Sequence, residues 1–311
     1  MRPLLIGCTV YGQRYLHSFL NYTWPSLLSE GNFSALSKVR EVRLLIHTDQ
    51  ITAPYLSEKG FTCVADIMEG DKYEQLGYNQ RMDLCIAKEK GADYHLLLPD
   101  FVYSGDFFTG MLKASEKHKA ITRLVVSTCQ EKIWPHLKVG MTAEELATLS
   151  LKYIHPGVKH WLMSEEGLPN THVLAWETVD TLRMCSPHQT VVYIANEVIN
   201  LADSNLPLDC ILDKIIEGDI YCTRPEDGMV IIELSPKDSR KLNDKVIDLP
   251  EFARIFKWDT KNSQKQFEIF QKETVDPVNR KALGGQYWND LEISRQKAIV
   301  CDEIRRSYAV A

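Results

Sequence analysis

Short, nearly continuous apolar segments alternate with amphipathic segments through the first 130 residues, and this alternation constrains the fold more than any other feature. The apolar segments are too short for buried helices and are typical of strands buried on both faces of a parallel sheet. The segments between them have helical spacing. The pattern therefore predicts an α/β fold with a mostly parallel, helix-covered sheet and right-handed crossovers. The expected strands are 3–10, 42–48, 61–67, 94–98 and 120–128, and the expected helices are 15–28, 54–59, 73–90 and 107–118.

The segment 73–90 is the strongest helix prediction in the chain. Its apolar stripe comprises Leu76, Met82, Cys85, Ile86 and Ala87, and Gly91 is placed to end it. The strand assignments predict a core that contains Leu4, Ile6, Leu45, Leu97 and Val125.

The pattern changes after Cys129. Thr142 and Glu145 form a capping box that predicts a helix start, and strands are expected at 189–194 and 227–235. We expect residues 1–130 and 131–262 to be the two halves of one domain, followed by a helical C-terminal extension, 263–311. Its final helix, 287–308, is predicted to be a packing element or the contact of a homo-oligomer.

Charge and cysteine content narrow the class of protein. The net charge of −6 leaves no basic stripe for nucleic acid, so a nucleic-acid partner is not expected. None of the 8 cysteines forms a Cys-x-x-Cys pair, which favours free thiols in a reducing cytosol. Leu5-Ile6-Gly7-Cys8 has the form of a lipoprotein cleavage box, but the apolar run before it is too short for a signal peptide. No run approaches the roughly 20 residues of a membrane span, and we expect a cytoplasmic protein.

Several nucleotide and hydrolase motifs are missing. No Gly-x-Gly-x-x-Gly follows the first strand, and the chain has neither a P-loop nor a Gly-x-Ser-x-Gly elbow. Ligands of open α/β sheets bind at the carboxyl ends of the strands. This rule selects the loops at 9–12, 48–49, 67–71 and 99–105, in which Thr9, Tyr11, Thr48 and Asp49 could hold a base and a ribose. Tyr11 could equally be a core aromatic.

The stretch from residue 78 to residue 104 carries the main resemblance. Tyr78-Asn79-Gln80-Arg81 lies in the predicted helix, and Gly91 leads into an apolar strand that ends in Pro99-Asp100-Phe101-Val102. This arrangement resembles the GT-A glycosyltransferases, in which the strand tip carries an Asp-x-Asp motif. The resemblance implies a Rossmann-like sheet, a nucleotide-sugar donor and a divalent metal, Mn²⁺ or Mg²⁺, bound by Asp100. Arg81 would then meet the diphosphate.

The motif departs from the family pattern at its second carboxylate. Val102 stands there and cannot bind a metal, while Asp106 is shifted along the loop. Asp100 could instead only cap the turn before the helix at Phe107, and Arg81 could be a solvated charge on a helix.

The chain also resembles, more loosely, a group of bacterial GT-A-like proteins. This likeness supports the fold more than a reaction. Its points are Trp24-Pro25-Ser26-Leu27-Leu28 with Gly31-Asn32, the segment 97–104, Tyr153-Ile154-His155-Pro156, and Pro207-Leu208-Asp209-Cys210-Ile211-Leu212-Asp213.

The second half would supply acceptor and catalytic groups. The resemblance implies a third metal ligand from a histidine, either His172 or His188. An inverting transfer needs a carboxylate base, and Asp209 is the first choice, with Asp213 four residues away. Other candidates are His155, Trp176, Glu177, Asn196 and Glu197.

Three functions are consistent with these patterns. The first is a glycosyltransferase that moves a sugar from a nucleotide sugar to an acceptor glycan, lipid or protein. The alternative is a non-catalytic GT-A-like binding module that has lost its metal site, as Val102 would allow. A nucleotidyltransferase is the third, although Gly7 to Arg14 is a poor version of its loop.

Overall fold

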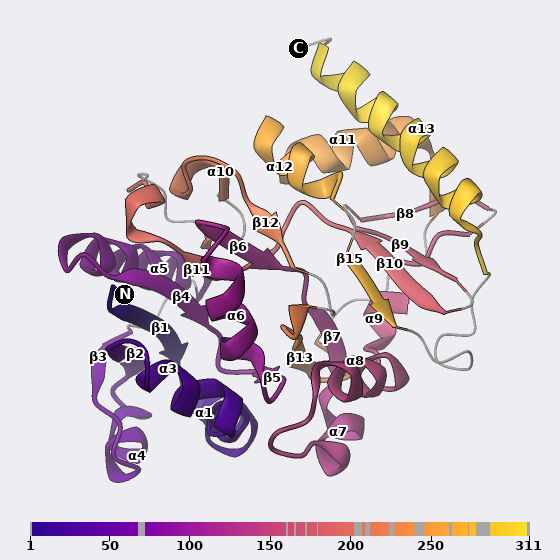
Figure 1. The fold of residues 1–311 in the computed structure, drawn as a ribbon. Helices are drawn as coiled ribbons and strands as arrows, with labels where there is room; N and C mark the ends of the chain where they lie inside the picture. The colour runs from indigo at the N-terminus through magenta and orange to yellow at the C-terminus, as the bar shows by residue number, and fades with distance from the viewer. Residues whose placement is uncertain are drawn as a thin grey trace. The chain divides into compact units, whose positions relative to one another are not determined.

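The computed structural model contains a seven-stranded sheet (Figure 1). The strand β1 pairs in parallel with both β2 and β4, and β2 pairs in parallel with β3. The strand β11 is antiparallel to β4 and β6, and β12 is parallel to β6. The predicted α/β class with a mostly parallel sheet is confirmed. In spatial order the strands are β3 (Cys63–Ile67), β2 (Val42–Asp49), β1 (Leu4–Val10), β4 (Asp93–Leu97), β11 (Thr190–Ile194), β6 (Ala120–Arg123) and β12 (Tyr221–Cys222).

The chain divides into two units. Unit 1 comprises Met1–Val125, Leu137–Ala143 and Gln189–Leu234, and unit 2 comprises Val126–His136, Glu144–His188 and Ser235–Ala311. The structure describes residues 2–67, 72–159, 161–164, 166–171, 173–178, 180–201, 207–208, 212–223, 227–239, 246–260, 263–272, 274–277 and 287–309.

The other elements of unit 1 are short apart from one long helix. They are α1 (Gly12–Ser18), η1 (Phe19–Thr23), α2 (Trp24–Leu27), η2 (Glu30–Ser34), α3 (Ala35–Ser37), α4 (Ala53–Glu58), α5 (Lys72–Glu89), β5 (Phe101–Tyr103), α6 (Phe107–Ser115), η4 (Asn196–Val198), α10 (Leu212–Ile215) and β13 (Ile231–Ser235).

Two neighbouring residues of β4 show which helix covers which face of the sheet. Successive side chains of a strand point to opposite faces. The hydroxyl of Tyr94 approaches Asp83 on α5, whereas the ring of His95 packs against Phe107 and Phe108 on α6. The helices α5 and α6 therefore cover opposite faces of the sheet.

The core on the α6 side confirms much of the expected burial. Leu4, Ile6 and Leu97 are fully buried there, as predicted. Leu45 and Val125 are only partly buried. Leu45 lies on the α5 face of β2, and α5 packs mainly over β1 and β4, so this part of β2 is less covered.

The predicted helix 15–28 forms as a chain of helical turns rather than one regular helix. The helix α1 continues into the π-helical segment η1 and then into α2, where Pro25 stands in the first turn. Because Pro25 lies inside this continuous helical stretch, its missing N–H removes one backbone hydrogen bond of the helix. Trp24 packs edge-on against Phe61 with ring centroids 4.9 Å apart, which fixes this segment to the residues before β3.

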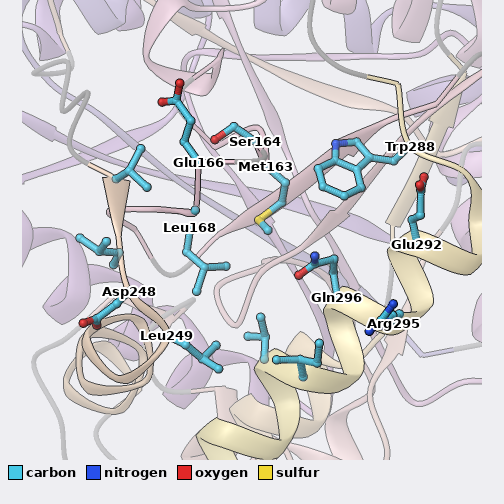
Figure 2. A pocket seen from close by; sticks show the side chains of 15 residues that line it. Met163, Ser164, Glu166, Leu168, Asp248, Leu249, Trp288, Glu292, Arg295 and Gln296 are labelled. Carbon is cyan, nitrogen blue, oxygen red and sulfur yellow. The ribbon is translucent and has the colours of Figure 1, made fainter.

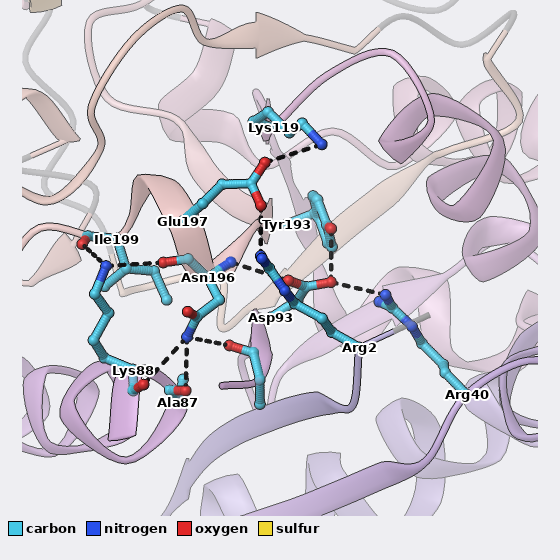
Figure 3. Close-up of polar contacts among 11 residues, drawn as sticks. Arg2, Arg40, Ala87, Lys88, Asp93, Lys119, Tyr193, Asn196, Glu197 and Ile199 are labelled. Carbon is cyan, nitrogen blue, oxygen red and sulfur yellow. Dashed lines mark hydrogen bonds and ion pairs between the residues drawn. The ribbon is translucent and has the colours of Figure 1, made fainter. Parts of the chain in front are cut away.

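A polar network closes the amino end of β4 (Figure 3). Arg40 donates to Asp93 over 2.7 Å, and both side chains are nearly fully buried. The hydroxyl of Tyr193 and the backbone N–H of Asn196 donate to the same carboxylate over 2.8 and 3.0 Å. The buried charge of Asp93 is thus compensated by three donors. Its carboxylate connects β4 to β11 at the end of the sheet opposite the carboxyl end of β4.

A second buried network lies under α5. Nδ1 of His47 contacts Asp66 at 2.7 Å, and Nε2 contacts Asp83 at 2.9 Å. Burial alone would lower the pKa of His47, but its hydrogen bonds to the two carboxylates raise it. Burial raises the pKa of Asp83 to about 6, against the opposing effect of His47. A side chain on Gly7 would collide with the Asp83 carboxylate, so this position requires glycine.

This network overturns part of the predicted stripe on α5. Met82 is exposed, whereas Gln80 and Asp83 are almost completely buried. The helix itself forms as expected, over Lys72–Glu89. Its buried face is partly polar because His47 offers Asp83 a partner inside the protein.

Unit 2 combines small sheets with helices. The strands β9 and β10 form an antiparallel hairpin, β15 pairs with β10, and β14 pairs with β8. The predicted final helix is confirmed as α13. The elements are β7 (Val126–Cys129), α7 (Gln130–Ile133), η3 (Trp134–His136), α8 (Ala143–Lys152), α9 (Pro156–Lys159), β8 (Leu168–Pro169), β9 (Leu174–Glu177), β10 (Thr181–Cys185), β14 (Val246–Ile247), α11 (Leu249–Asp259), α12 (Gln264–Phe270), β15 (Thr274–Pro277) and α13 (Asp290–Ala309).

The core of unit 2 is separate from that of unit 1. Trp176, Phe252, Phe256 and Phe270 are completely buried there, together with Ile304 from α13. The terminal helix is therefore a packing element of unit 2, and its role in an oligomer stays a prediction.

No helix in the described parts of the chain is long and apolar enough to cross a membrane. The described cysteines are all free, and most are buried.

The His47 network predicts a specific pH dependence. The folded-state pKa of Asp83 lies above its unfolded value, so its contribution to stability is complete at low pH and is lost as the pH rises through about 6. The raised pKa of His47 acts in the same direction. We expect the free energy of unfolding, relative to Asp83→Asn, to fall by about 3 kcal/mol between about pH 4 and pH 7.

Urea unfolding across this range measures the difference between the two proteins. Asp302→Asn is the control, because Asp302 is exposed on α13, and it should show no such trend. A constant difference between native protein and Asp83→Asn would contradict the prediction.

Candidate functional site

The strand order of unit 1 reverses direction between β1 and β4. From β3 to β1 the strands run in descending chain order, and β4 then lies on the other side of β1. Open α/β sheets bind ligands at the carboxyl ends of the strands at such a point. The residues that follow β1 and β4 therefore mark the candidate site.

Asp100 lies three residues beyond the end of β4, in this region. Its side chain is only 10% exposed and lies 3.5 Å from Nη2 of Arg14. Its backbone carbonyl accepts a hydrogen bond from the N–H of Leu234 over 2.8 Å. The carboxylate is thus held at the strand tip by both the main chain and a cation.

The alternative role of Asp100, a cap on the turn before the helix at Phe107, has to account for a strand that lies between them. The strand β5 follows Asp100, and Val102 of β5 lies opposite Ile232 of β13. The helix α6 begins later, and its N-cap residue is Asp106, whose side chain makes no capping bond. Val102 is buried, so the second position of the resembled motif faces protein.

Arg14 approaches the site from α1, the helix that follows β1. Nη2 donates to the carbonyl of Leu234 over 3.2 Å, and the guanidinium lies 4.8 Å from the centre of the Tyr15 ring. Burial and the charge of Asp100 raise the pKa of Tyr15 to about 12, while Arg14 opposes this shift. Tyr15 is therefore a neutral hydroxyl beside an ion pair.

Tyr11 stands where β1 gives way to α1. Its ring is partly exposed and lies 5.2 Å from that of Tyr15, tilted by 41°. A partly exposed aromatic face beside a cation is suited to a heterocyclic base. The structure therefore brings Tyr11, Arg14, Tyr15 and Asp100 into one region.

Asp49 ends β2 and connects two loops. One oxygen accepts from the N–H of Gly12 over 2.8 Å and from the Thr52 hydroxyl. The other accepts from the N–H groups of Ile51 and Thr52. Although partial burial opposes ionisation, these hydrogen bonds lower the pKa of Asp49. Its carboxylate holds the start of α1, the helix that follows Tyr11 and carries Arg14.

The two predicted threonines lie inside the sheet. Thr9 is opposite His47 in the register of β1 and β2 and is 3% exposed, and Thr48 is completely buried. Because both side chains are buried, they could affect a ligand only by positioning the residues that follow them at the ends of β1 and β2.

Arg81 is not brought to the strand tips. Asp83 faces the sheet, and two residues of α-helix correspond to a rotation of about 200°. Arg81 therefore lies on the side of α5 that faces away from β1, with its guanidinium 5.8 Å from the Tyr78 ring. Its assignment to the diphosphate stays a prediction.

The remaining predicted residues lie elsewhere. His188 belongs to unit 2, in the turn between β10 and β11, where its N–H donates to the Ser186 hydroxyl. Asp209 and His172 fall outside the described residues. In the parts that the structure describes, no three His, Cys, Asp or Glu side chains form a group that could hold a metal.

Sequence reasoning missed Arg14 and Tyr15 as site residues. A signal was present, because Gly12-Gln13-Arg14-Tyr15 directly follows the first strand.

Comparisons with known proteins identify no family for this chain. No family model matches the chain, and no curated protein matches it. Among solved structures, the crystal structure of GalNAc-T7 with UDP, GalNAc and Mn²⁺ aligns with 97% of this chain at a TM-score of 0.38 and 12% identity. The chain spans about half of that protein, 54% of its length. At this TM-score the likeness assigns neither a fold family nor a function to the chain.

The bonds of Asp49 predict a measurable contribution to stability. Asp49→Ala removes the acceptor for several backbone N–H groups and should cost about 1–2 kcal/mol in the free energy of unfolding at neutral pH. Because the folded-state pKa of Asp49 is lowered, this contribution should be present above the ordinary aspartate pKa and lost as the pH falls below it.

Urea unfolding at neutral and acidic pH tests this expectation. Glu58→Ala, at an exposed position of the helix α4 that follows the turn after Asp49, is the matched control and should change little. Equal stabilities of Asp49→Ala and Glu58→Ala at neutral pH would exclude the structural role.

Proposed function

We propose that the chain binds a nucleoside diphosphate sugar at the tips of β1 and β4 and transfers the sugar to an acceptor. The observation that carries the proposal is the Arg14–Asp100 pair at the point where the strand order reverses. It combines a cation for the diphosphate with a carboxylate for the sugar side, and the cation lies 4.8 Å from the centre of the Tyr15 ring. The resemblance of the segment around Asp100 to the GT-A motif supports the same assignment.

Arg14 is the first group to act in this proposal. Its contact with Asp100 is a single one at 3.5 Å, and its side chain is 38% exposed. An ion pair with one long contact and a partly exposed arginine is weak. A diphosphate offers bidentate, charge-assisted hydrogen bonds to a guanidinium, and these are stronger. The donor would therefore draw Arg14 to its phosphates.

Asp100 then acts at the sugar. The carboxylate is fixed at the strand tip by the Asp100–Leu234 backbone bond, so it can accept hydrogen bonds from sugar hydroxyls without further ordering. Asp209, as the catalytic base, remains a proposal from the sequence.

The described residues fit a protein-built metal cage poorly. Val102 is buried in β5, and Asp100 belongs to no group of three metal-binding side chains in the part of the chain that the structure describes. Magnesium can be held by one carboxylate together with substrate phosphates. Asp100 would be that carboxylate, and no step of the proposal depends on the metal. The His188 assignment remains a prediction.

A second candidate is a binding module that recognises a nucleotide sugar without transferring the sugar. The observation that favours it is again Val102, which is buried opposite Ile232 where the resembled motif carries a carboxylate. Binding and turnover must therefore be measured separately.

The role of Arg14 predicts a difference between charged and uncharged ligands. Arg14→Gln should weaken the binding of a nucleoside diphosphate about tenfold, or about 1.4 kcal/mol. Binding of the matched nucleoside should hardly change, because it carries no phosphate. Calorimetry with UDP, GDP, CDP and ADP and their nucleosides, with and without Mn²⁺, measures both affinities.

Arg81→Gln is the matched control for this experiment. If Arg81 meets the phosphates, as the sequence predicts, its variant should show the loss instead. Equal losses for nucleotide and nucleoside in Arg14→Gln would point to a folding defect. Failure of all four nucleotides to bind the native protein would overturn the proposed function.

Asp100→Asn separates the transferase from the binding module. The substitution keeps the shape of the side chain and removes its charge. In a transferase the hydrolysis of the donor sugar should fall by at least about a hundredfold, while the unfolding free energy changes little. In a binding module neither protein would turn over the donor. Full activity in Asp100→Asn would exclude a catalytic role for Asp100.

A further inference from the structure

Unit 2 contains a pocket of about 890 Å³ whose residues have no part in the proposed donor site (Figure 2). This volume is in the range of small-molecule sites, about 300–1,000 Å³. Three segments form its walls. They are residues 163–164 and 166–168, which lead into β8, residues 246–249 of β14 and the start of α11, and residues 288–300 of α13 and the turn before it.

The floor of the pocket is apolar. Met163, Leu168, Ile247, Trp288 and Val300 line it, and each is less than a tenth exposed. The indole N–H of Trp288 is buried and has no hydrogen-bond partner among the described residues. The floor therefore offers one aromatic ring and several aliphatic groups to a ligand.

Polar groups at the pocket divide into two kinds. The carboxylates of Asp248 and Glu292 already cap helices, since each accepts from a backbone N–H over 2.9 and 3.0 Å respectively. Arg295 and Gln296 make no hydrogen bond or ion pair with any residue that the structure describes. In Figure 2 the carboxylates stand at the rim, whereas the Gln296 carboxamide lies near the middle, close to Met163.

The charges exclude several kinds of ligand. With Glu166, three carboxylates face one guanidinium, so the lining is net negative and disfavours a phosphate or another anion. The attraction for a cation is reduced, because Asp248 and Glu292 already accept from backbone N–H groups and Arg295 offsets one of the negative charges. An acyl chain would remove Gln296 and Arg295 from water without giving them hydrogen bonds, which is costly.

A neutral sugar satisfies all of these conditions. Its hydroxyls can both donate to carboxylates and accept from amide and guanidinium groups, while the C–H face of its ring packs on apolar and aromatic side chains. We propose that this pocket binds a neutral carbohydrate of one or two rings, held by Gln296 and Arg295 over the floor formed by Trp288 and Met163. The site is independent of the donor site and of any transfer reaction.

The test uses the full chain and saturation-transfer NMR with cellobiose, maltose, lactose and chitobiose at millimolar concentration. Spermidine and decanoate serve as the cationic and apolar alternatives. At least one disaccharide should bind, and Gln296→Leu and Arg295→Gln should each weaken it about tenfold, the loss of roughly one hydrogen bond. The matched control is Arg306→Gln, on the same helix but outside the pocket, which should bind like the native protein.

The outcomes separate this inference from the proposed function. UDP binding should be the same in native protein, Gln296→Leu and Arg295→Gln, so loss of sugar binding alone identifies the pocket. The inference is overturned if none of the four sugars binds, if both variants bind sugar like the native protein, or if spermidine or decanoate is the ligand that Gln296→Leu loses. Arg295 is exposed, so Arg295→Gln gives a result even if Gln296→Leu does not fold.

Discussion

The burial of β1 between β2 and β4 is the constraint on which unit 1 depends. All seven of its residues are buried, and its two faces pack against different layers. On one face Gly7 leaves room for the Asp83 carboxylate, which reaches His47 on the neighbouring strand. At the carboxyl end the same strand continues into the turn of Tyr11 and the helix of Arg14. A shift of β1 by one residue would reverse its faces and disturb both arrangements.

Sequence patterns predicted β1, β2, β3, β4 and β11 because buried strands are short and mostly apolar, but the expected strand 120–128 divides into β6 and β7, and β5 was not predicted. They failed on the inner face of α5, where Gln80 and Asp83 are buried and Met82 is exposed. Periodicity assigns polar side chains to the solvent, and the partner of Asp83 lies 36 residues away in the sequence. The return of β11 into the sheet between β4 and β6 was equally invisible, since strand order depends on long-range pairing.

The candidate site was only partly predictable for a similar reason. Asp100 and Tyr11 were selected because they follow apolar strands, and the structure places both at the strand tips. Arg14 was passed over, because the sequence shows which helix carries an arginine but not which way that arginine points. Asp49 was expected to face a ligand, whereas its carboxylate holds the loops together. A polar residue at a strand tip can serve either purpose, and its hydrogen bonds distinguish them.

The two sites proposed for this chain select ligands by opposite arrangements of charge. At the tips of β1 and β4 a half-exposed arginine has one weak carboxylate partner, so an arriving anion can replace that partner at little cost. In the pocket of unit 2 the carboxylates outnumber the single guanidinium and are partly committed to helix caps, so an anion would meet repulsion. A molecule with both a charged diphosphate and a neutral sugar would therefore be bound by its phosphates only at the first site. The choice between the two sites therefore depends on the charges within each site: Arg14 with Asp100 at the first, and Arg295 with its acidic neighbours at the second. The net charge of −6 of the whole chain does not determine it.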